Sequence, residues 1–171
     1  RSPPDQRYYH QSAFILMNMI FAICTSHLLG DTESDPLKAR RHYDVAMVLM
    51  QPSLLRDWKL EHVQALLLGI RYLLGTNCSN ECWNVLGLAI RVSYGLRLHH
   101  DPPESDPYTL QETKRRVWYA AYTLDVLLSM IYDRPAATRS DECTVQLPQD
   151  LDDDLIRNER PAFLVPKRPS S

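Results

Sequence analysis

Glycine is scarce in this chain, with five residues among 171. A glycine-rich phosphate-binding loop, or the sharp strand-turn-helix elbow that holds a hydrolase nucleophile, needs several glycines close together. Neither pattern occurs, and valine, isoleucine and phenylalanine do not recur in the alternating runs of half-buried strands. The composition therefore argues against nucleotide-binding α/β enzymes and β-sheet folds, and it favours helices.

Cysteine is also scarce, which argues against a disulfide-stabilised fold and favours a reducing compartment. A zinc site could be assembled on paper from Cys78, Cys82, His99, His100 and Asp101. Structural zinc usually takes two cysteines from one tight knuckle, whereas Cys82 is expected inside a helix. We therefore predict no metal and no cofactor in this chain. The four cysteines are Cys24, Cys78, Cys82 and Cys143.

Net charge and hydropathy exclude two further classes of partner. The formal net charge is −2, and phosphate binding needs a concentrated positive surface, so direct nucleic-acid contact is not expected. The most apolar window, residues 10–29, is shorter than an uninterrupted membrane span and predicts a buried helix. No secretory signal is visible at the N-terminus. We expect neither a nucleic-acid surface nor a membrane anchor here.

Helical spacing of apolar residues predicts an all-α fold, an irregular multi-helix bundle of antiparallel helical hairpins. The expected domain is residues 10–148, with a boundary segment at 1–9 and an acidic, then Pro/Ser-rich tail at 149–171. The acidic run 150–154 is expected to be solvated, because no second carboxylate cluster is present to share a magnesium ion. The predicted helices cover 10–29, 36–50, 60–74, a segment starting at Ser79 or Asn80, and 109–133.

Several local features of these helices can be predicted. Asp35 should cap the second helix and Pro52 should end it. Gly75 should end the third helix in a left-handed conformation. Gly87 and Gly95 should allow another helix to approach closely. Thr109 and Glu112 match a capping box, and the helix that follows should bury Val117, Ala121, Leu124, Leu128 and Ile131.

Asp125 is the most informative ionisable residue, because it shares a helix side with Trp118 and Tyr122. A carboxylate in that place loses solvent and needs a partner, and Arg134 or Arg91 could supply one. A structural ion pair is favoured over a ligand-binding role. If a regulatory pocket exists, we expect it around Gly87, Arg91, Gly95, Trp118, Tyr122 and Asp125.

The order of motifs from Leu60 to Pro148 resembles the middle homology region of fungal zinc-cluster transcription factors. Each motif alone is weak, but their order and spacing together are specific. Residues 63–66 match its V-Q-A-L segment, residues 96–101 its G-L-H-R-D-like turn, residues 115–119 its R-R-x-W-W segment, and residues 133–135 its G-R-P tripeptide. The residues that match the family motifs are Trp83, Gly87, Arg91, His99, Asp101, Arg116, Trp118, Asp125, Arg134 and Pro135.

The resemblance implies the fungal-specific regulatory domain of a transcription factor, acting in the nucleus and not as an enzyme. The family's six-cysteine zinc cluster is absent, so zinc and DNA binding are expected only in an N-terminal module outside this chain. Other regions of the parent protein, a protein partner or a small-molecule effector are the implied partners, and a homodimer is left open. The chain departs from the family at Asp133, where glycine is usual, which puts a tight turn there in doubt.

Two alternatives remain from the sequence. A stand-alone helical interaction module would show an exposed apolar groove. A small all-α enzyme would show convergent ionisable groups in a deep cleft.

Overall fold

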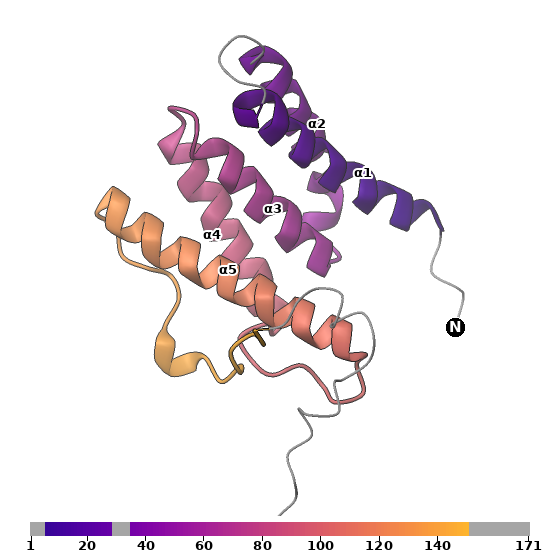
Figure 1. Ribbon diagram of the computed structural model, residues 1–171, viewed down its shortest axis with the longest axis vertical. Helices are drawn as coiled ribbons and strands as arrows, with labels where there is room; N and C mark the ends of the chain where they lie inside the picture. Colours follow the sequence, from indigo (N-terminus) through magenta and orange to yellow (C-terminus); the bar gives the residue numbers. More distant parts are fainter. Residues whose placement is uncertain (1–5, 29–34, 151–171) are drawn as a thin grey trace, which may run out of the picture.

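The computed structural model describes residues 6–28 and 35–150 of the chain (Figure 1). Within this part there are five α-helices and no strand, which confirms the all-α prediction. A π-helical turn, Cys24–Leu28, follows the first helix, and a short 3₁₀ turn, Ser140–Glu142, follows the last. The helices are α1 (Gln6–Ile23), α2 (Pro36–Leu54), α3 (Leu60–Leu73), α4 (Ser79–Gly95) and α5 (Tyr108–Tyr132).

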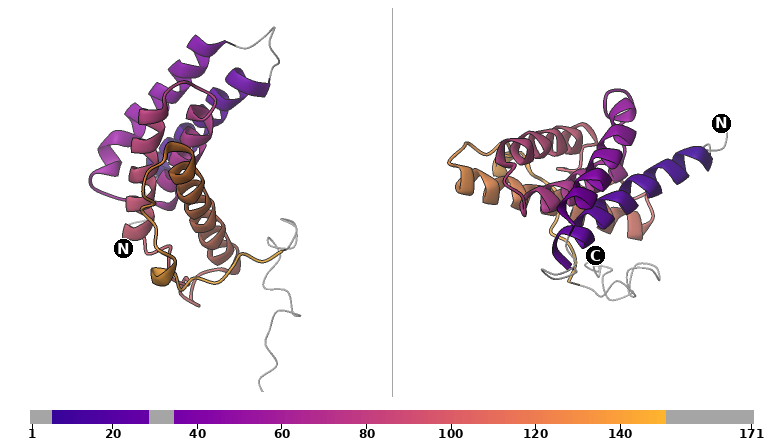
Figure 2. Two further views of the ribbon diagram at one scale, coloured as in Figure 1. Left: turned by 90° about the vertical axis from the view of Figure 1, so that its left-hand side faces the viewer. Right: turned by 90° about the horizontal axis from the view of Figure 1, so that it is seen from above.

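The helices pack as two antiparallel pairs and a fifth helix. Helices α1 and α2 form one pair, α3 and α4 form the other, and α1 also packs against α3 (Figures 1 and 2). Helix α5 contacts α4 and α3. The chain then returns along α5 as an extended segment. We call residues 134–149 of this segment the strap.

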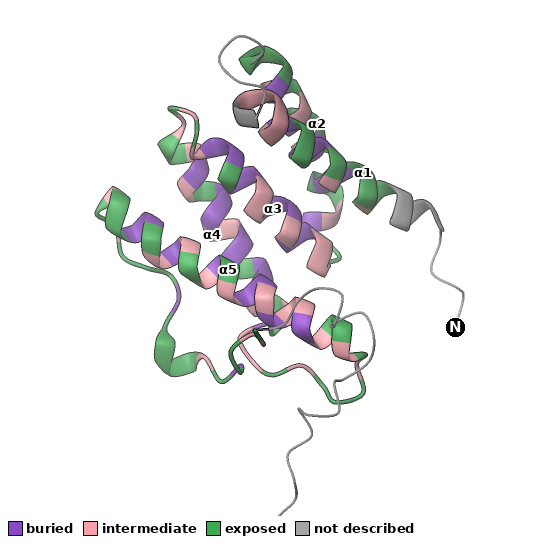
Figure 3. Ribbon diagram, viewed as in Figure 1, coloured by how far each residue is buried: buried purple, intermediate pink, exposed green. Residues whose placement is uncertain are grey.

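Each helix buries one face in a common core (Figure 3). The second helix buries Ala39, Tyr43, Ala46, Met50 and Leu54, which follow one another at steps of three or four residues along one face. Trp118 of α5 is completely buried and is the largest side chain of the core. Burying a large aromatic residue stabilises a fold by about 3 kcal/mol or more relative to alanine. The largest side chain of the core therefore lies where α5 packs against the end of α4.

The second helix begins as predicted but ends later. The Asp35 carboxylate accepts a hydrogen bond of 3.0 Å from the Lys38 amide, and Pro36 occupies the first turn. Pro52 does not end this helix, which continues to Leu54. A proline deprives only the carbonyl four residues earlier of its donor. That residue, Val48, is exposed, so water can satisfy its carbonyl.

Helix α5 differs from its prediction at both ends. It begins at Tyr108 after Pro107, and Glu112 is not part of a capping box, because its carboxylate is buried against the strap. At the other end Asp133 adopts the left-handed conformation, with φ of 51°. The tight turn that we doubted therefore forms without glycine, since aspartate tolerates this conformation better than most residues do.

Apolar side chains of α5 and α1 are more exposed than the sequence predicted. Ile131, assigned to the core of α5, is 59% exposed. On α1 the outward side chains Phe14, Met17, Ile20 and Phe21 are each 42–50% exposed. The prediction of a buried helix over residues 10–29 was therefore wrong for the outer face of α1. Among the described residues no helix is long and apolar enough to cross a bilayer.

The two glycines of α4 have different surroundings. A Cβ atom added to Gly95 would overlap the Trp58 ring, whose indole N–H donates to the Leu54 carbonyl at 2.6 Å. Gly95 thus permits a close approach, made by a tryptophan rather than by a helix. A Cβ atom at Gly87 would meet nothing within 4 Å. The predicted close packing at Gly87 was wrong.

We therefore expect opposite results from one substitution at the two sites. Gly87→Ala should raise the free energy of unfolding by up to about 1 kcal/mol, because alanine favours helix and open space receives the methyl group. Gly95→Ala should lower it by about 1–2 kcal/mol through displacement of Trp58. Urea denaturation of both variants measures the difference. Equal effects of the two substitutions would contradict the packing described for Trp58.

His62 joins the end of α2 to the start of α3. Its Nδ1 accepts from the Lys59 amide at 3.2 Å, so Nε2 carries the proton and donates to the Ser53 hydroxyl at 3.0 Å. The Ser53 hydroxyl in turn donates to the Met50 carbonyl at 2.8 Å. Burial lowers the pKa of His62, and Lys59 lowers it further. The folded state therefore holds this imidazole neutral.

This chain of hydrogen bonds makes stability depend on pH. The unfolded chain binds a proton at His62 below pH about 6.5, whereas the folded chain resists it, so stability falls as pH falls below that value. His62→Gln keeps an acceptor for Lys59 without titrating. Between pH 7.5 and pH 5.5, by thermal denaturation, wild type should lose more stability than the variant. The other histidines are common to both proteins, so identical profiles would show that His62 does not titrate on unfolding.

Candidate functional site

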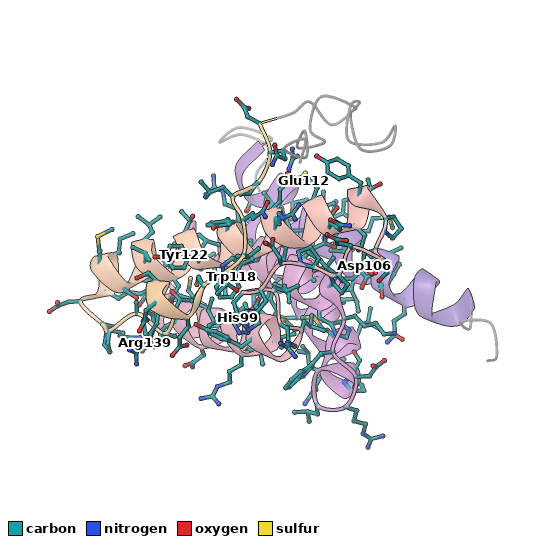
Figure 4. The ribbon with its side chains drawn as sticks, turned by 90° about the horizontal axis from the view of Figure 1, so that it is seen from below. His99, Asp106, Glu112, Trp118, Tyr122 and Arg139 are labelled. Atoms are coloured by element: carbon teal, nitrogen blue, oxygen red, sulfur yellow. The ribbon has the colours of Figure 1, made fainter. Side chains whose placement is uncertain are left out.

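The strap lies across the α4–α5 turn and along α5, and its contacts use many of the residues singled out from the sequence. Figure 4 shows His99, Trp118 and Tyr122 gathered near one another, with Arg139 of the strap close by and Glu112 farther along α5. Most of the strap is exposed, and Thr138 and Val145 are its buried residues. Hydrogen bonds therefore contribute much of the interaction that holds the strap against α5 and the α4–α5 turn.

Asp125 holds the start of the strap. Its Oδ2 accepts three hydrogen bonds, from the Ala137 amide at 2.9 Å, the Thr138 amide at 2.7 Å and the Thr138 hydroxyl at 2.7 Å. The side chain is 1% exposed. The predicted ion pair with Arg91 or Arg134 was wrong, because backbone amides satisfy this carboxylate instead. Buried carboxylates are stable when several donors surround them.

The turn after α4 holds the middle of the strap. The His99 carbonyl accepts from the Thr144 amide at 3.0 Å and from the Val145 amide at 3.2 Å. The His100 ring nitrogen Nδ1 lies 2.8 Å from the Thr144 hydroxyl. Arg97 adopts the left-handed conformation, with φ of 57°, so the chain reverses sharply before His99. The G-L-H-R-D-like segment is thus a turn that receives the strap.

Two more carboxylates hold the remainder of the strap. Asp101 Oδ1 accepts from the Gln146 amide at 3.1 Å and from Arg115 Nε at 3.2 Å. Glu112 Oε1 accepts from the Gln149 amide at 2.9 Å and from Arg116 Nε at 3.1 Å. In addition, the Tyr119 hydroxyl donates to the Val145 carbonyl at 3.0 Å. Arginines of α5 therefore orient the carboxylates that bind strap amides.

An aromatic cluster lies between these attachment points. The Trp118 ring centroid is 5.4 Å from that of Tyr94 and 5.8 Å from that of His99. Cys143 of the strap borders this cluster, and its thiol donates to the Arg139 carbonyl at 3.2 Å. Burial raises the pKa of Cys143, and Glu142 raises it further. Burial lowers the pKa of His99, as do His100 and Arg97, so the cluster contains a thiol and a neutral imidazole at neutral pH.

Arg134 begins the strap and contacts the start of α4. Its guanidinium lies 5.1 Å from the ring centroid of Trp83 and 5.7 Å from that of Tyr132. It also donates to Asn80 Oδ1 at 2.9 Å. Cation–π contacts of this kind stabilise exposed sites by about 0.5–1 kcal/mol each. Pro135 follows at once and keeps the chain from continuing as helix.

The structure brings only some of the predicted site residues together. His99, Asp101, Arg116, Trp118 and Asp125 all support the strap. Tyr122 lies beside Trp118, with ring centroids 6.5 Å apart, whereas Arg91 is exposed on α4. A hollow of about 390 Å³ lies beneath the α4–α5 turn, lined by residues 96–98, 100–103 and Lys114. It does not involve the residues around which we expected a pocket.

Some residues of the site were missed by the sequence analysis. Glu112 was assigned to a helix cap, and Arg115, Tyr119 and Thr138 were given no contact with a distant segment. The one available signal was their position, since Glu112, Arg115 and Tyr119 occupy successive turns of one helix. The part of the chain that the structure describes holds no group of three histidine, cysteine or acidic side chains suited to a metal.

Loss of the Asp125 carboxylate should release the strap. Asp125→Ala leaves two amides and one hydroxyl of the strap without their acceptor, at a cost of about 3–5 kcal/mol. We expect faster tryptic cleavage after Arg139 and a lower melting temperature. Thr138→Val removes only one of the three bonds and should have a smaller effect. Unchanged cleavage at Arg139 in the alanine variant would show that Asp125 does not hold the strap.

Comparison with known proteins identifies relatives of this chain. A family model described as the fungal specific transcription factor domain matches residues 1–168. An uncharacterized transcriptional regulatory protein of Schizosaccharomyces pombe is 30% identical over 78% of this chain and 18% of its own length. A protein of Fusarium pseudograminearum named as a transcription factor is 35% identical over 74% of this chain and 17% of its own length.

A similar transcription factor of Gibberella moniliformis is 34% identical over 71% of this chain and 17% of its own length. The chain thus covers less than a fifth of each of these relatives. No solved structure gives a significant match.

Proposed function

This chain belongs to the fungal specific transcription factor domain family, and we propose on that premise that it is the regulatory domain of a longer transcription factor. It controls transcriptional activity through contacts with other regions of the parent protein, with a protein partner or with a small effector. DNA binding, with any zinc that it needs, belongs to another region of the parent. The site of action is the nucleus.

The relatives support the general part of this proposal. They are named as transcriptional regulators or transcription factors. The chain covers less than a fifth of each, which leaves ample length for a DNA-binding module. The net charge of −2 gives this domain little electrostatic attraction for DNA. Regulation within a larger protein therefore fits it better than DNA contact.

The attachment of the strap is the observation that carries the mechanism. Several family-motif residues that lie far apart in sequence, among them Asp101, Arg116 and Asp125, support one segment. That segment is held by hydrogen bonds more than by buried apolar surface, so a competing partner can replace its contacts with moderate loss. A partner changes activity only if it binds the attached and released states differently. The strap supplies two such states.

Catalysis is less consistent with this site. Each of the carboxylates Asp101, Glu112 and Asp125 already binds amide groups of the strap. A general acid or base must instead have an atom directed at a substrate. We infer that these groups hold the chain and do not act on a substrate.

The test is a reporter assay in a fungal cell with the full parent protein. Tyr119→Phe combined with Thr138→Val removes one hydrogen bond at each of two places on the strap and leaves the core in position. Each bond contributes about 1 kcal/mol, so the equilibrium between attached and released strap should move by roughly tenfold or more. We expect reporter output to change several-fold, with promoter occupancy and protein abundance unchanged.

A matched variant separates the strap from the pocket that the sequence suggested. Arg91→Ala changes an exposed residue of α4 and should leave reporter output at the wild-type level. If Arg91→Ala alters output and the strap variant does not, regulation depends on α4. If neither variant alters output while a deletion of the domain does, the strap is not the regulatory element.

A further inference from the structure

Helix α1 is apolar on nearly every side. The sequence contains no aspartate, glutamate, lysine or arginine from Gln11 to Gly30. One face of α1 packs into the core, but Phe14, Met17, Ile20 and Phe21 are 42–50% exposed. A helix that is hydrophobic all round is normally buried on all sides. The outer face of α1 therefore requires a partner.

A groove lies next to this face, between α1 and α5. It has a volume of about 610 Å³. Figure 1 shows α3 between α1 and α5, so α3 forms the floor and the other two helices form the walls. The lining is mostly apolar and comprises Leu16 and Ile20 of α1, Gln64, Leu67 and Leu68 of α3, and Thr113, Arg116, Val117, Ala120 and Leu124 of α5.

The wall formed by α5 has the spacing of a helix-packing seam. Thr113, Val117, Ala120 and Leu124 are four and three residues apart in turn, and the same row continues to Leu127 and Ile131. These last two are 41% and 59% exposed. Alternating steps of three and four residues are the pattern that packs against a second helix. The sequence did not predict the exposure of Ile131. This exposure agrees with a row of apolar side chains on α5 that packs against a second helix.

Among the described residues that line the groove, the charged one is a cation, and a second cation lies just beyond the lining. Arg116 lines the groove near the start of α5, and Arg71 is exposed one turn beyond Leu67 on α3. Because α3 and α5 run in the same direction (Figure 1), the two arginines lie towards opposite ends. A second copy of this chain would present the same two cations, which disfavours self-association through this face.

We propose that this groove binds an acidic amphipathic helix of a partner protein. The partner helix places large apolar side chains three and four residues apart on the floor and walls, and acidic residues near Arg71 and Arg116. Recognition of an amphipathic helix by an apolar groove is a general mode of binding. Charge complementarity at the ends sets the orientation and favours acidic over basic helices. The inference rests on the proposed function for its biological meaning only, since binding is measured without transcription.

The probe is a designed peptide of about 16 residues, long enough to be helical when bound, with leucines at i, i+3, i+4 and i+7 and glutamates on its flanks. Two further peptides serve as controls: a scrambled sequence of the same composition and a version with lysine for glutamate. Fluorescence anisotropy with the full chain gives Kd for each. The acidic amphipathic peptide should bind at least about tenfold more tightly than either control.

Two substitutions in the groove and one outside it locate the binding site. Ala120→Glu places a charge on the α5 wall at an exposed residue and should weaken binding at least about tenfold. Arg71→Glu should weaken the acidic peptide and strengthen the lysine version. Val48→Glu, at the edge of a separate apolar hollow of about 360 Å³ beside α2, should bind like wild type. Circular dichroism confirms that the variants remain folded.

The proposal is overturned if the scrambled peptide binds as well, if Val48→Glu weakens binding as much as Ala120→Glu, or if no peptide binds. It is also overturned if sedimentation shows a dimer that Ala120→Glu dissociates, because a second copy would then occupy the groove. Failure of the strap reporter assay with intact peptide binding would refute the proposed regulatory mechanism and leave the docking site standing.

Discussion

The start of the strap is held by one buried carboxylate. Asp125 Oδ2 accepts three hydrogen bonds from Ala137 and Thr138, and the side chain has almost no contact with water. A carboxylate in such a place is stable only while those donors remain, and the donors themselves need an acceptor. The two sides are therefore interdependent. After Thr138 the strap runs along α5. Its amides donate in turn to the His99 carbonyl and to the carboxylates of Asp101 and Glu112.

This interdependence explains how motifs that lie far apart in sequence act on one segment. The turn after α4 provides a carbonyl and the Asp101 carboxylate, and α5 provides Glu112, Tyr119 and Asp125. The strap provides the amides. Trp118 fills the space between these points and contacts the rings of Tyr94 and His99. The motifs from residue 96 onward complete one another's contacts, so these make structural sense only as a set.

The helices could be predicted from the sequence more completely than their surroundings. Apolar spacing and the Asp35 cap depend on neighbouring residues, so the start of α2 and the core positions Val117, Ala121 and Leu128 were predicted correctly. Spacing also shows that a face is apolar, but it does not show what covers that face, which is why Ile131 was wrongly assigned to the core. The partner of Asp125 was missed for a related reason. The sequence reveals charged side chains such as Arg91 and Arg134, but it does not reveal which backbone amides will approach a carboxylate.

The groove and the strap share a residue, and this links the two proposals physically. Arg116 lines the groove, and its guanidinium also binds Glu112 at 3.1 Å and lies 3.5 Å from the Gln149 carbonyl at the end of the strap. An acidic helix that pairs with Arg116 in the groove competes with those bonds. Thermodynamic linkage makes the two effects equal. If the bound partner weakens strap attachment by some factor, then release of the strap strengthens partner binding by the same factor. Under the two proposals, occupancy of the groove and attachment of the strap would be coupled through this one guanidinium.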